Sequence, residues 1–174
     1  MSRKRFADNL VPDEVFDHIQ DITPEWLLAR GVRGLAVDLD NTLAFYRQSK
    51  PQPEVISWVR RMADGGIPVV IVSNGSEKRV MSFCEPLGVP YVFRAGKPRR
   101  DGYHKAIRVF ALPPGSIAQL GDQVFTDVWG AKRCGMVAIL VRPLRLKGHI
   151  LFSLRRMLES PFIREAIRRK RNPA

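Results

Sequence analysis

Short apolar runs alternate with stretches of helical periodicity along most of the chain. Runs rich in Val, Ile and Leu that end at Gly, Asn or Asp are typical of strands, whereas apolar residues three and four positions apart are typical of helices. The predicted strands cover residues 34–39, 68–72, 90–93, 117–121 and 136–141, and the predicted helices cover residues 53–64, 77–87, 101–111 and 125–134. This alternation predicts an α/β fold with a mostly parallel sheet flanked by helices.

The segment that precedes the first predicted strand, residues 10–28, has the pattern of two short helices. Thr23 followed by Pro24 is typical of a capping residue followed by the first residue of a helix. We therefore expect the sheet to begin with the run at residues 34–39.

Polar and charged residues follow four of the apolar runs directly. They are Asp38, Asp40 and Thr42 after the first run, Ser73 and Asn74 after the second, Lys97 after the third, and Asp122 and Asp127 after the fourth. In an open α/β sheet, ligands bind outside the carboxyl ends of the strands, so we expect these side chains to meet. Taken alone, the first pair of aspartates could also be helix-capping residues, and that alternative stays open.

Together and in this order, the four stretches resemble the four motifs of the haloacid dehalogenase-like phosphatase superfamily, over residues 34–141. The resemblance implies a Rossmann-like fold in which Asp38 is the nucleophile that becomes an aspartyl-phosphate. It implies that Asp40 is the general acid and base and that Lys97 is both catalytic and phosphate-binding. The remaining residues that it assigns to the phosphoryl group are Thr42, Ser73 and Asn74.

The resemblance also implies a magnesium site. Its ligands would be Asp38, the backbone carbonyl of Asp40, and Asp122, with Asp127 supporting them. A carboxylate that attacks a phosphate monoester faces like-charge repulsion, so the site must supply positive charge. Mg²⁺, which prefers oxygen ligands, and Lys97 would supply it.

The spacing of the motifs leaves no room for a large cap domain. The residues between Asp40 and Ser73 are used by one loop, one helix and one strand, and those between Ser73 and Lys97 by one helix, one short strand and a loop. Without a cap the site is open. An open site favours a phosphate carried by a bulky partner, such as a protein, a nucleic acid or a lipid headgroup.

The composition adds a preference for anionic partners. The 174 residues carry a formal net charge of +12, which favours nucleic acid or an anionic membrane surface. The two cysteines lie in predicted helices without a paired spacing, so a disulfide framework is not expected and a reducing, cytoplasmic location is. No apolar run approaches the roughly 18 residues of a membrane-spanning helix.

Residues 146–174 form a predicted basic amphipathic helix that follows a capless phosphatase domain over residues 1–145. Apolar residues recur at helical spacing among many arginines; they are Ile150, Leu151, Leu154, Met157, Leu158, Phe162, Ile163 and Ile167. One interpretation is an interfacial helix that attaches the protein to anionic lipid. The other is a terminal helix packed on the core with a solvated basic face.

The motifs also resemble a narrower group, the YqeG-like subfamily of bacterial class IIIA phosphatases, over nearly the whole chain. That subfamily is related to phosphatidylglycerophosphate phosphatases, which implies removal of the terminal phosphate from phosphatidylglycerophosphate at a membrane surface. Gly75 stands where the subfamily often has a second asparagine, and Arg99, Arg100 and Asp101 make the turn after Lys97 unusually charged. Arg99 and Arg100 are candidates for contact with a second phosphate.

Two other functions remain open. One is a phosphatase for a protein, nucleic-acid or soluble metabolite phosphate. The other is a non-catalytic basic module that binds RNA or the ribosome, although the tail has no recognisable nucleic-acid reading motif. The expected location is cytoplasmic, with peripheral attachment to the inner face of the cell membrane if the lipid interpretation holds.

Overall fold

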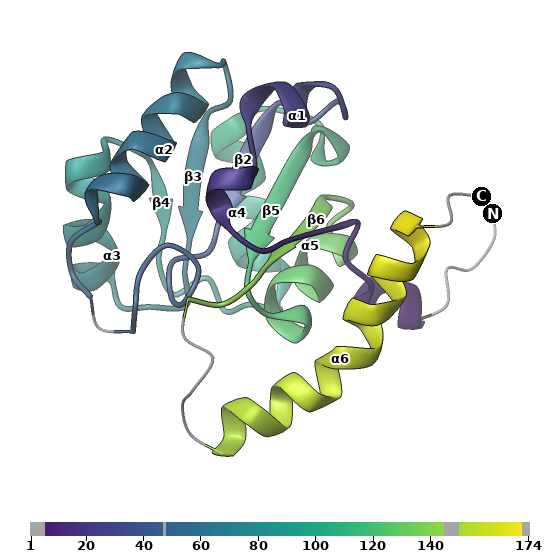
Figure 1. Cartoon of the computed structure of the whole chain (residues 1–174). Helices are drawn as coiled ribbons and strands as arrows, with labels where there is room; N and C mark the ends of the chain where they lie inside the picture. Colours follow the sequence, from purple (N-terminus) through teal and green to yellow (C-terminus); the bar gives the residue numbers. More distant parts are fainter. Residues whose placement is uncertain (1–5, 47, 145–149, 172–174) are drawn as a thin grey trace.

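The computed structural model of the protein describes residues 6–46, 48–144 and 150–171, with side chains of the last segment described from residue 154. Its centre is one six-stranded sheet in the order β1-β6-β5-β2-β3-β4, in which every pairing is parallel (Figure 1). The strands are β1 (Glu14–Phe16), β2 (Gly34–Val37), β3 (Val69–Val72), β4 (Tyr91–Val92), β5 (Ile117–Gly121) and β6 (Val137–Val141). The predicted α/β fold with a parallel sheet is confirmed.

Helices cover both faces of the sheet, and each face has its own apolar layer. One layer receives side chains from α1 (Pro24–Leu28), α2 (Pro53–Asp64) and α3 (Glu77–Cys84). The other receives side chains from α4 (Arg100–Phe110) and α5 (Trp129–Arg133). Alternation along the strands feeds both layers: Leu35 and Val37 of β2 belong to the first and Ala36 to the second. Both faces of β2 are therefore buried.

Several elements end differently from their predictions. The predicted strand at residues 34–39 stops at Val37, so Asp38 begins the loop above it. The helix predicted for residues 77–87 ends at Cys84 and continues as a 3-10 turn, η3 (Glu85–Leu87). The helix predicted for residues 125–134 begins as a wider, π-helical turn, η5 (Val124–Val128), before α5. A further 3-10 turn, η4 (Pro114–Ser116), leads into β5.

The prediction of two short helices over residues 10–28 was wrong in one respect, because a strand lies between them. The chain forms the 3-10 turn η1 (Phe6–Leu10), then β1, then the 3-10 turn η2 (Ile19–Asp21) and α1. β1 has only three residues and pairs with β6 at the edge of the sheet. The Asp13 carboxylate secures this edge by accepting a 2.8 Å hydrogen bond from the Ala138 N–H. A strand this short has too few residues for a readable alternation.

The C-terminal segment forms one helix, α6 (Ile150–Arg171), which continues through Pro161. It runs from beyond the carboxyl ends of the strands to the β1 edge and contacts β1 and η5 (Figure 1). Phe162 and Ile163 pack on the core, whereas the apolar side chains one to two turns earlier are exposed. These are Leu154, Met157 and Leu158, with 47%, 62% and 55% exposure. The apolar stripe is thus divided between core packing and solvent.

Two expectations concern residues that the structure does not describe. The side chains of Ile150 and Leu151 lie outside the described residues, and so does the predicted boundary at residues 145/146. Within the described part, no helix is long and apolar enough to cross a bilayer. The same part contains no cap domain between β2 and β4.

Candidate active site

The neighbouring strands β2 and β5 bring three aspartates together at their carboxyl ends. Asp38 follows β2 directly, and its N–H donates a 2.8 Å hydrogen bond to the carbonyl of Leu120 in β5. Asp122 follows β5, and Asp127 lies in the turn η5 beyond it. One carboxylate oxygen from each of the three lies within 4.8 Å of the others, and all three residues are buried.

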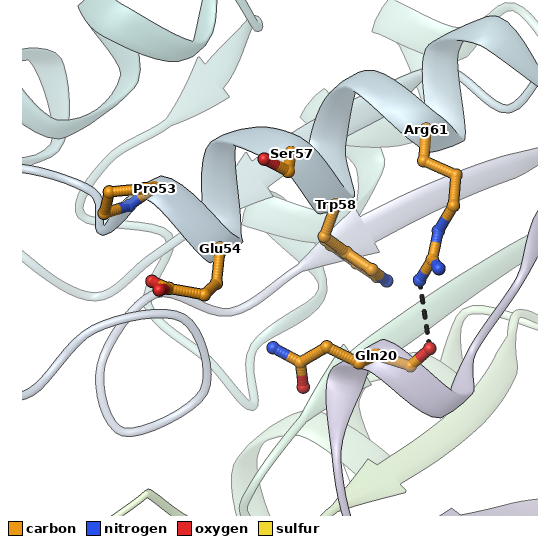
Figure 2. A pocket seen from close by; sticks show the side chains of 6 residues that line it. All are labelled: Gln20, Pro53, Glu54, Ser57, Trp58 and Arg61. Carbon is orange, nitrogen blue, oxygen red and sulfur yellow. Dashed lines mark hydrogen bonds between the residues drawn. The ribbon is translucent and has the colours of Figure 1, made fainter.

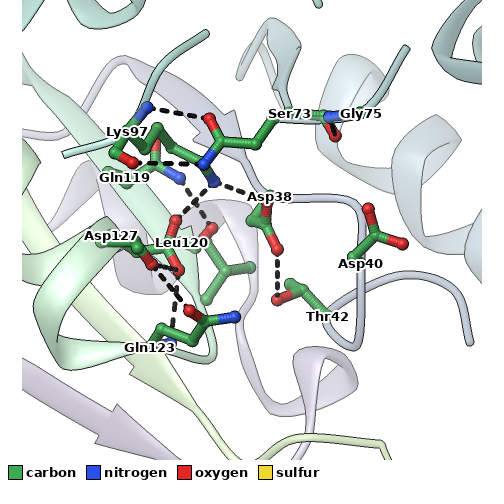
Figure 3. Close-up of polar contacts among 12 residues, drawn as sticks. Asp38, Asp40, Thr42, Ser73, Gly75, Lys97, Gln119, Leu120, Gln123 and Asp127 are labelled. Atoms are coloured by element: carbon green, nitrogen blue, oxygen red, sulfur yellow. Dashed lines mark hydrogen bonds and ion pairs between the residues drawn. The ribbon is translucent and has the colours of Figure 1, made fainter. Parts of the chain in front are cut away.

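Lys97 supplies the positive charge of this cluster. Its ammonium nitrogen lies 2.5 Å from Asp38 Oδ1 and 2.6 Å from Asp127 Oδ1, and the residue is buried (Figure 3). Burial alone would lower the pKa of Lys97, but the carboxylates of Asp127 and Asp38 outweigh it and raise the pKa above its usual range. Lys97 therefore stays protonated.

The three carboxylates and one ammonium leave the cluster with two negative charges in excess when all are ionised. Burial, with the charge of Asp127 adding to it and that of Lys97 opposing it, raises the pKa of Asp38 to about 7. Burial and the charges of Asp38 and Asp127 raise the pKa of Asp122 well above its usual range. In the metal-free protein, desolvation thus opposes the ionisation of Asp38 and Asp122.

A divalent cation with a preference for oxygen fits these residues. It would balance the two excess charges, and the available donors are carboxylate oxygens, which suit Mg²⁺. Asp122 Oδ1 is buried and accepts no hydrogen bond from any residue that the structure describes. An unsatisfied buried carboxylate oxygen is costly unless a ligand completes it. Asp38, Asp122 and Asp127 therefore form a candidate metal site.

Gly121 allows the side chain of Asp127 to lie directly against the end of β5. A Cβ atom added at Gly121 would lie 2.2 Å from Asp127 Cγ, which is a severe overlap. Only a residue without a side chain lets Asp127 approach the end of β5. Asp127 Oδ2 is then fixed by the Gln123 N–H at 3.2 Å and by the Thr126 hydroxyl at 3.3 Å.

The predicted phosphate-binding residues surround the cluster on the β2 and β3 side. The Thr42 hydroxyl donates to Asp38 Oδ2 over 3.4 Å, and the buried Ser73 hydroxyl accepts from the Gly75 N–H over 3.0 Å. The Asn74 amide pairs with the backbone of Lys97, donating to its carbonyl at 3.2 Å and accepting from its N–H at 2.8 Å. The side chain of Asn74 therefore holds the loop that carries Lys97.

Asp40 lies outside the buried cluster and has a partner that the sequence analysis missed. Arg79 of α3 forms an ion pair of 2.8 Å with Asp40 Oδ1 and donates over 3.3 Å to the carbonyl of Gln48. The Asp40 side chain keeps 28% exposure. The only signal in the sequence was a basic residue in the first turns of the helix after the Ser73–Asn74 stretch. Because Arg79 pairs with the Asp40 carboxylate, the backbone carbonyl of Asp40 is the oxygen of this residue that remains a candidate metal ligand, as the sequence predicts.

A model of haloacid dehalogenase-like hydrolases matches residues 3–135 of the chain. The chain belongs to the haloacid dehalogenase-like hydrolases. It is 39% identical over 160 residues to "Probable phosphatase YqeG" of Bacillus subtilis (strain 168), a match that covers 92% of each protein. It is 30% identical over 134 residues to "Phosphatidylglycerophosphate phosphatase 1, chloroplastic" of Chlamydomonas reinhardtii, covering 70% of this chain and 49% of that relative. This hydrolase thus spans about half the length of the algal relative.

Solved structures show the same fold at low sequence identity. A variant of CbbY from Rhodobacter sphaeroides, in complex with xylulose-(1,5)bisphosphate, matches with a TM-score of 0.53 at 14% identity over 70% of this hydrolase and 91% of that chain. The cobalt-bound deoxy-D-mannose-octulosonate 8-phosphate phosphatase from Haemophilus influenzae matches with a TM-score of 0.51 at 11% identity, over 64% and 69%. The predicted family and fold are confirmed, and phosphatase activity is supported.

Arg99 and Arg100, the candidates for a second phosphate, are exposed at the start of α4 of the hydrolase. Among the described residues, neither makes a hydrogen bond or ion pair with the buried cluster. Arg100 lies near Cys134, where burial raises the pKa of the thiol and the charge of Arg100 opposes that rise. A substrate-binding role for the two arginines stays a prediction.

The described cavities lie beside the cluster rather than over it. One of about 420 Å³ lies between α2 and the segment around Gln20, where Arg61 donates a 2.9 Å hydrogen bond to the Gln20 carbonyl (Figure 2). Another, of about 220 Å³, is lined by Thr42, Phe45 and Leu144 among others and begins next to the site. Neither is an enclosure around Asp38, in line with a site that has no cap.

Proposed function

We propose that this hydrolase cleaves a phosphate monoester through an aspartyl-phosphate at Asp38, with Mg²⁺ as its cofactor. The observation that carries the proposal is the buried group of Asp38, Asp122 and Asp127 with a single compensating cation, Lys97. Such an excess of buried negative charge is unfavourable unless a cation offsets it, and a cation held there can in turn attract a phosphoryl group.

In the first half-reaction, a carboxylate oxygen of Asp38 attacks phosphorus, and the bond from phosphorus to the ester oxygen breaks. The leaving oxygen takes a proton from Asp40, which is exposed enough to exchange protons with water. Lys97, 2.5 Å from Asp38, neutralises negative charge near the attacking group. When bound, Mg²⁺ supplies positive charge to the phosphoryl oxygens.

In the second half-reaction, Asp40 acts as a base. It takes a proton from a water molecule, whose oxygen attacks phosphorus and releases inorganic phosphate from Asp38. Arg79 fixes the Asp40 carboxylate through its 2.8 Å ion pair, so one residue can serve both steps from one position. The hydrogen bond from Thr42 orients Asp38 for the next cycle.

The proposed substrate is phosphatidylglycerophosphate, which would be converted to phosphatidylglycerol. Support comes from the similarity to the algal phosphatidylglycerophosphate phosphatase and from a site that no cap encloses. A lipid headgroup fixed in a bilayer can enter an open site that a domain need not close over.

The proposed place of action is the cytoplasmic face of a membrane, reached through α6. Its exposed apolar side chains, Leu154, Met157 and Leu158, share the helix with basic residues that attract anionic lipid. An exposed apolar group flanked by arginines is typical of a peripheral membrane surface rather than of a nucleic-acid reading surface.

A phosphate-release assay tests this function. The substrates are phosphatidylglycerophosphate in anionic vesicles, a phosphopeptide, an oligonucleotide with a terminal phosphate, and soluble sugar phosphates, each with and without Mg²⁺. We expect Mg²⁺-dependent release from the lipid above all others, and none from Asp38→Asn, which keeps the shape of Asp38 but lacks its attacking anion. Full activity of a folded Asp38→Asn protein would remove the mechanism, and preference for a soluble ester would remove the lipid assignment.

A further inference from the structure

One face of α6 holds the loop that carries Asp122. The Asp122 carbonyl accepts a 3.1 Å hydrogen bond from Arg156 Nη1, and the same nitrogen lies 3.3 Å from Glu159 Oε2. Glu159 Oε1 in turn accepts a 2.9 Å hydrogen bond from the Val124 N–H. Arg156 and Glu159 therefore bind the loop on either side of Gln123 and also bind each other.

The next positions of the loop have partners on the same helix face. The Gln123 amide oxygen accepts a 2.9 Å hydrogen bond from Arg155, and the ring of Phe125 packs edge-to-face against Phe162 with 6.3 Å between centroids. The four partners on α6 fall at positions 155, 156, 159 and 162, which is the spacing of a single helical face. Four consecutive loop residues are thus anchored to one helix.

Glu159 is the most informative of these partners because it is a charged residue with 1% exposure outside the catalytic cluster. Burial raises its pKa, while the charges of Arg156 and Arg155 and the N–H groups of Val124 and Phe125 oppose that rise. Its carboxylate lies at the amino end of the helical segment formed by η5 and α5, where a negative charge is favourable. The energetic cost of burying Glu159 is offset only while this geometry is kept.

We propose that Arg156 and Glu159 are positioning residues for the metal site. They fix the loop so that a carboxylate oxygen of Asp122 lies within 4.8 Å of those of Asp38 and Asp127, and α6 thereby contributes to the geometry of the site. The proposal rests on the proposed metal-dependent function. Residues that orient a metal ligand from behind commonly change metal affinity by about 10–100-fold when replaced.

The test measures Mg²⁺ binding without substrate, by calorimetric titration of the full chain. The variants are Glu159→Gln and Arg156→Gln, and the matched controls are Glu165→Gln and Arg168→Gln, an ion pair on the same helix in which Arg168 is exposed and Glu165 half-buried. We expect the first two variants to bind Mg²⁺ about 10-fold or more weakly and the controls to bind like the wild type. In metal-free protein, amide hydrogen exchange at Val124 and Phe125 should become faster in Glu159→Gln only.

High Mg²⁺ should restore turnover of the weakened variants, and their circular dichroism without Mg²⁺ should match that of the wild type, which excludes a loss of folded protein. Arg156 has 27% side-chain exposure, so Arg156→Gln remains a usable variant if Glu159→Gln does not fold. Wild-type Mg²⁺ affinity in a folded Arg156→Gln protein would overturn the proposal. That result would leave the phosphatase function intact, whereas failure of every phosphate ester in the assay above would leave the Mg²⁺ difference intact.

Discussion

Lys97 and Glu165 each sit between two opposite charges, but in contrasting surroundings. The Lys97 ammonium lies 2.5 Å from Asp38 and 2.6 Å from Asp127, and its side chain has 3% exposure. Glu165 accepts 2.8 Å hydrogen bonds from two arginines on the surface of α6, one of them with 73% side-chain exposure. The distances are similar, so solvent is the main difference between the two groups.

That difference changes what each group can do. Hydrogen bonds from the two arginines lower the pKa of Glu165 to about 2. Because water and salt screen these charges, the lowered pKa corresponds to little stabilisation of the fold. Around Lys97 the screening is weak, and any unpaired charge carries a large desolvation cost. The buried charges can therefore interact strongly with a bound ligand, whereas the surface charges of α6 attract anionic partners over a distance.

Removing the positive charge of Lys97 from the buried cluster should have the largest effect on activity and stability. Lys97→Met leaves three carboxylates without a cation, so we expect phosphate release to fall to background and metal-free stability to fall by about 3–5 kcal/mol. Urea unfolding in the presence of a chelator measures the second quantity. Stability unchanged from the wild type would show that the cluster is already neutralised by protonation.

Asp40 lies between the buried cluster and the solvent-exposed surface. Its replacement should strongly reduce turnover and leave stability nearly unchanged. Asp40→Asn removes general acid-base catalysis, worth roughly 10²–10⁴-fold in turnover, while the contact of this half-buried side chain with solvent predicts little change in stability. Arg79→Met should reduce turnover less, because the carboxylate remains. The check is phosphate release together with thermal unfolding, and a larger loss in Arg79→Met than in Asp40→Asn would contradict the assigned roles.

The pH dependence of the metal-free protein should report the buried cluster. Because burial raises the pKa of Asp38 to about 7, this group contributes stability at acid pH that is lost as the pH rises from about 4 through about 7. Mg²⁺ favours the ionised form, so the rise in Tm that it causes should be greater at pH 8 than at pH 5. Asp38→Asn should reduce this dependence, with the raised pKa of Asp122 accounting for the part that remains, and thermal scans with and without Mg²⁺ would measure it.

The smallest effect is expected at the surface group. Glu165→Gln removes the central charge between two arginines, yet water solvates the freed guanidinium groups. We expect no measurable change in Tm and no change in turnover of a soluble ester. A clear drop in Tm would mean that α6 depends on this pair, and the contrast with Lys97 would no longer hold.

The carboxyl-terminal edge of the sheet was the part of the molecule that the sequence described best. Asp38, Lys97, Asp122 and Asp127 meet as predicted because polar residues after successive strands of a parallel sheet must share one edge. Local periodicity also fixed most elements, as with α2, whose predicted range of residues 53–64 matches Pro53–Asp64. Neither inference needed knowledge of distant contacts.

The tertiary structure alone decided the rest. The three residues of β1 became a strand only because β6 offered an open edge, and Arg79 reached Asp40 only because α3 packs beside the β2 loop. The periodicity of α6 predicted an apolar stripe but not that Phe162 would be packed, Leu158 exposed and Glu159 buried. Helical spacing shows which side chains share a face, whereas the choice of the buried face depends on surfaces formed by distant parts of the chain.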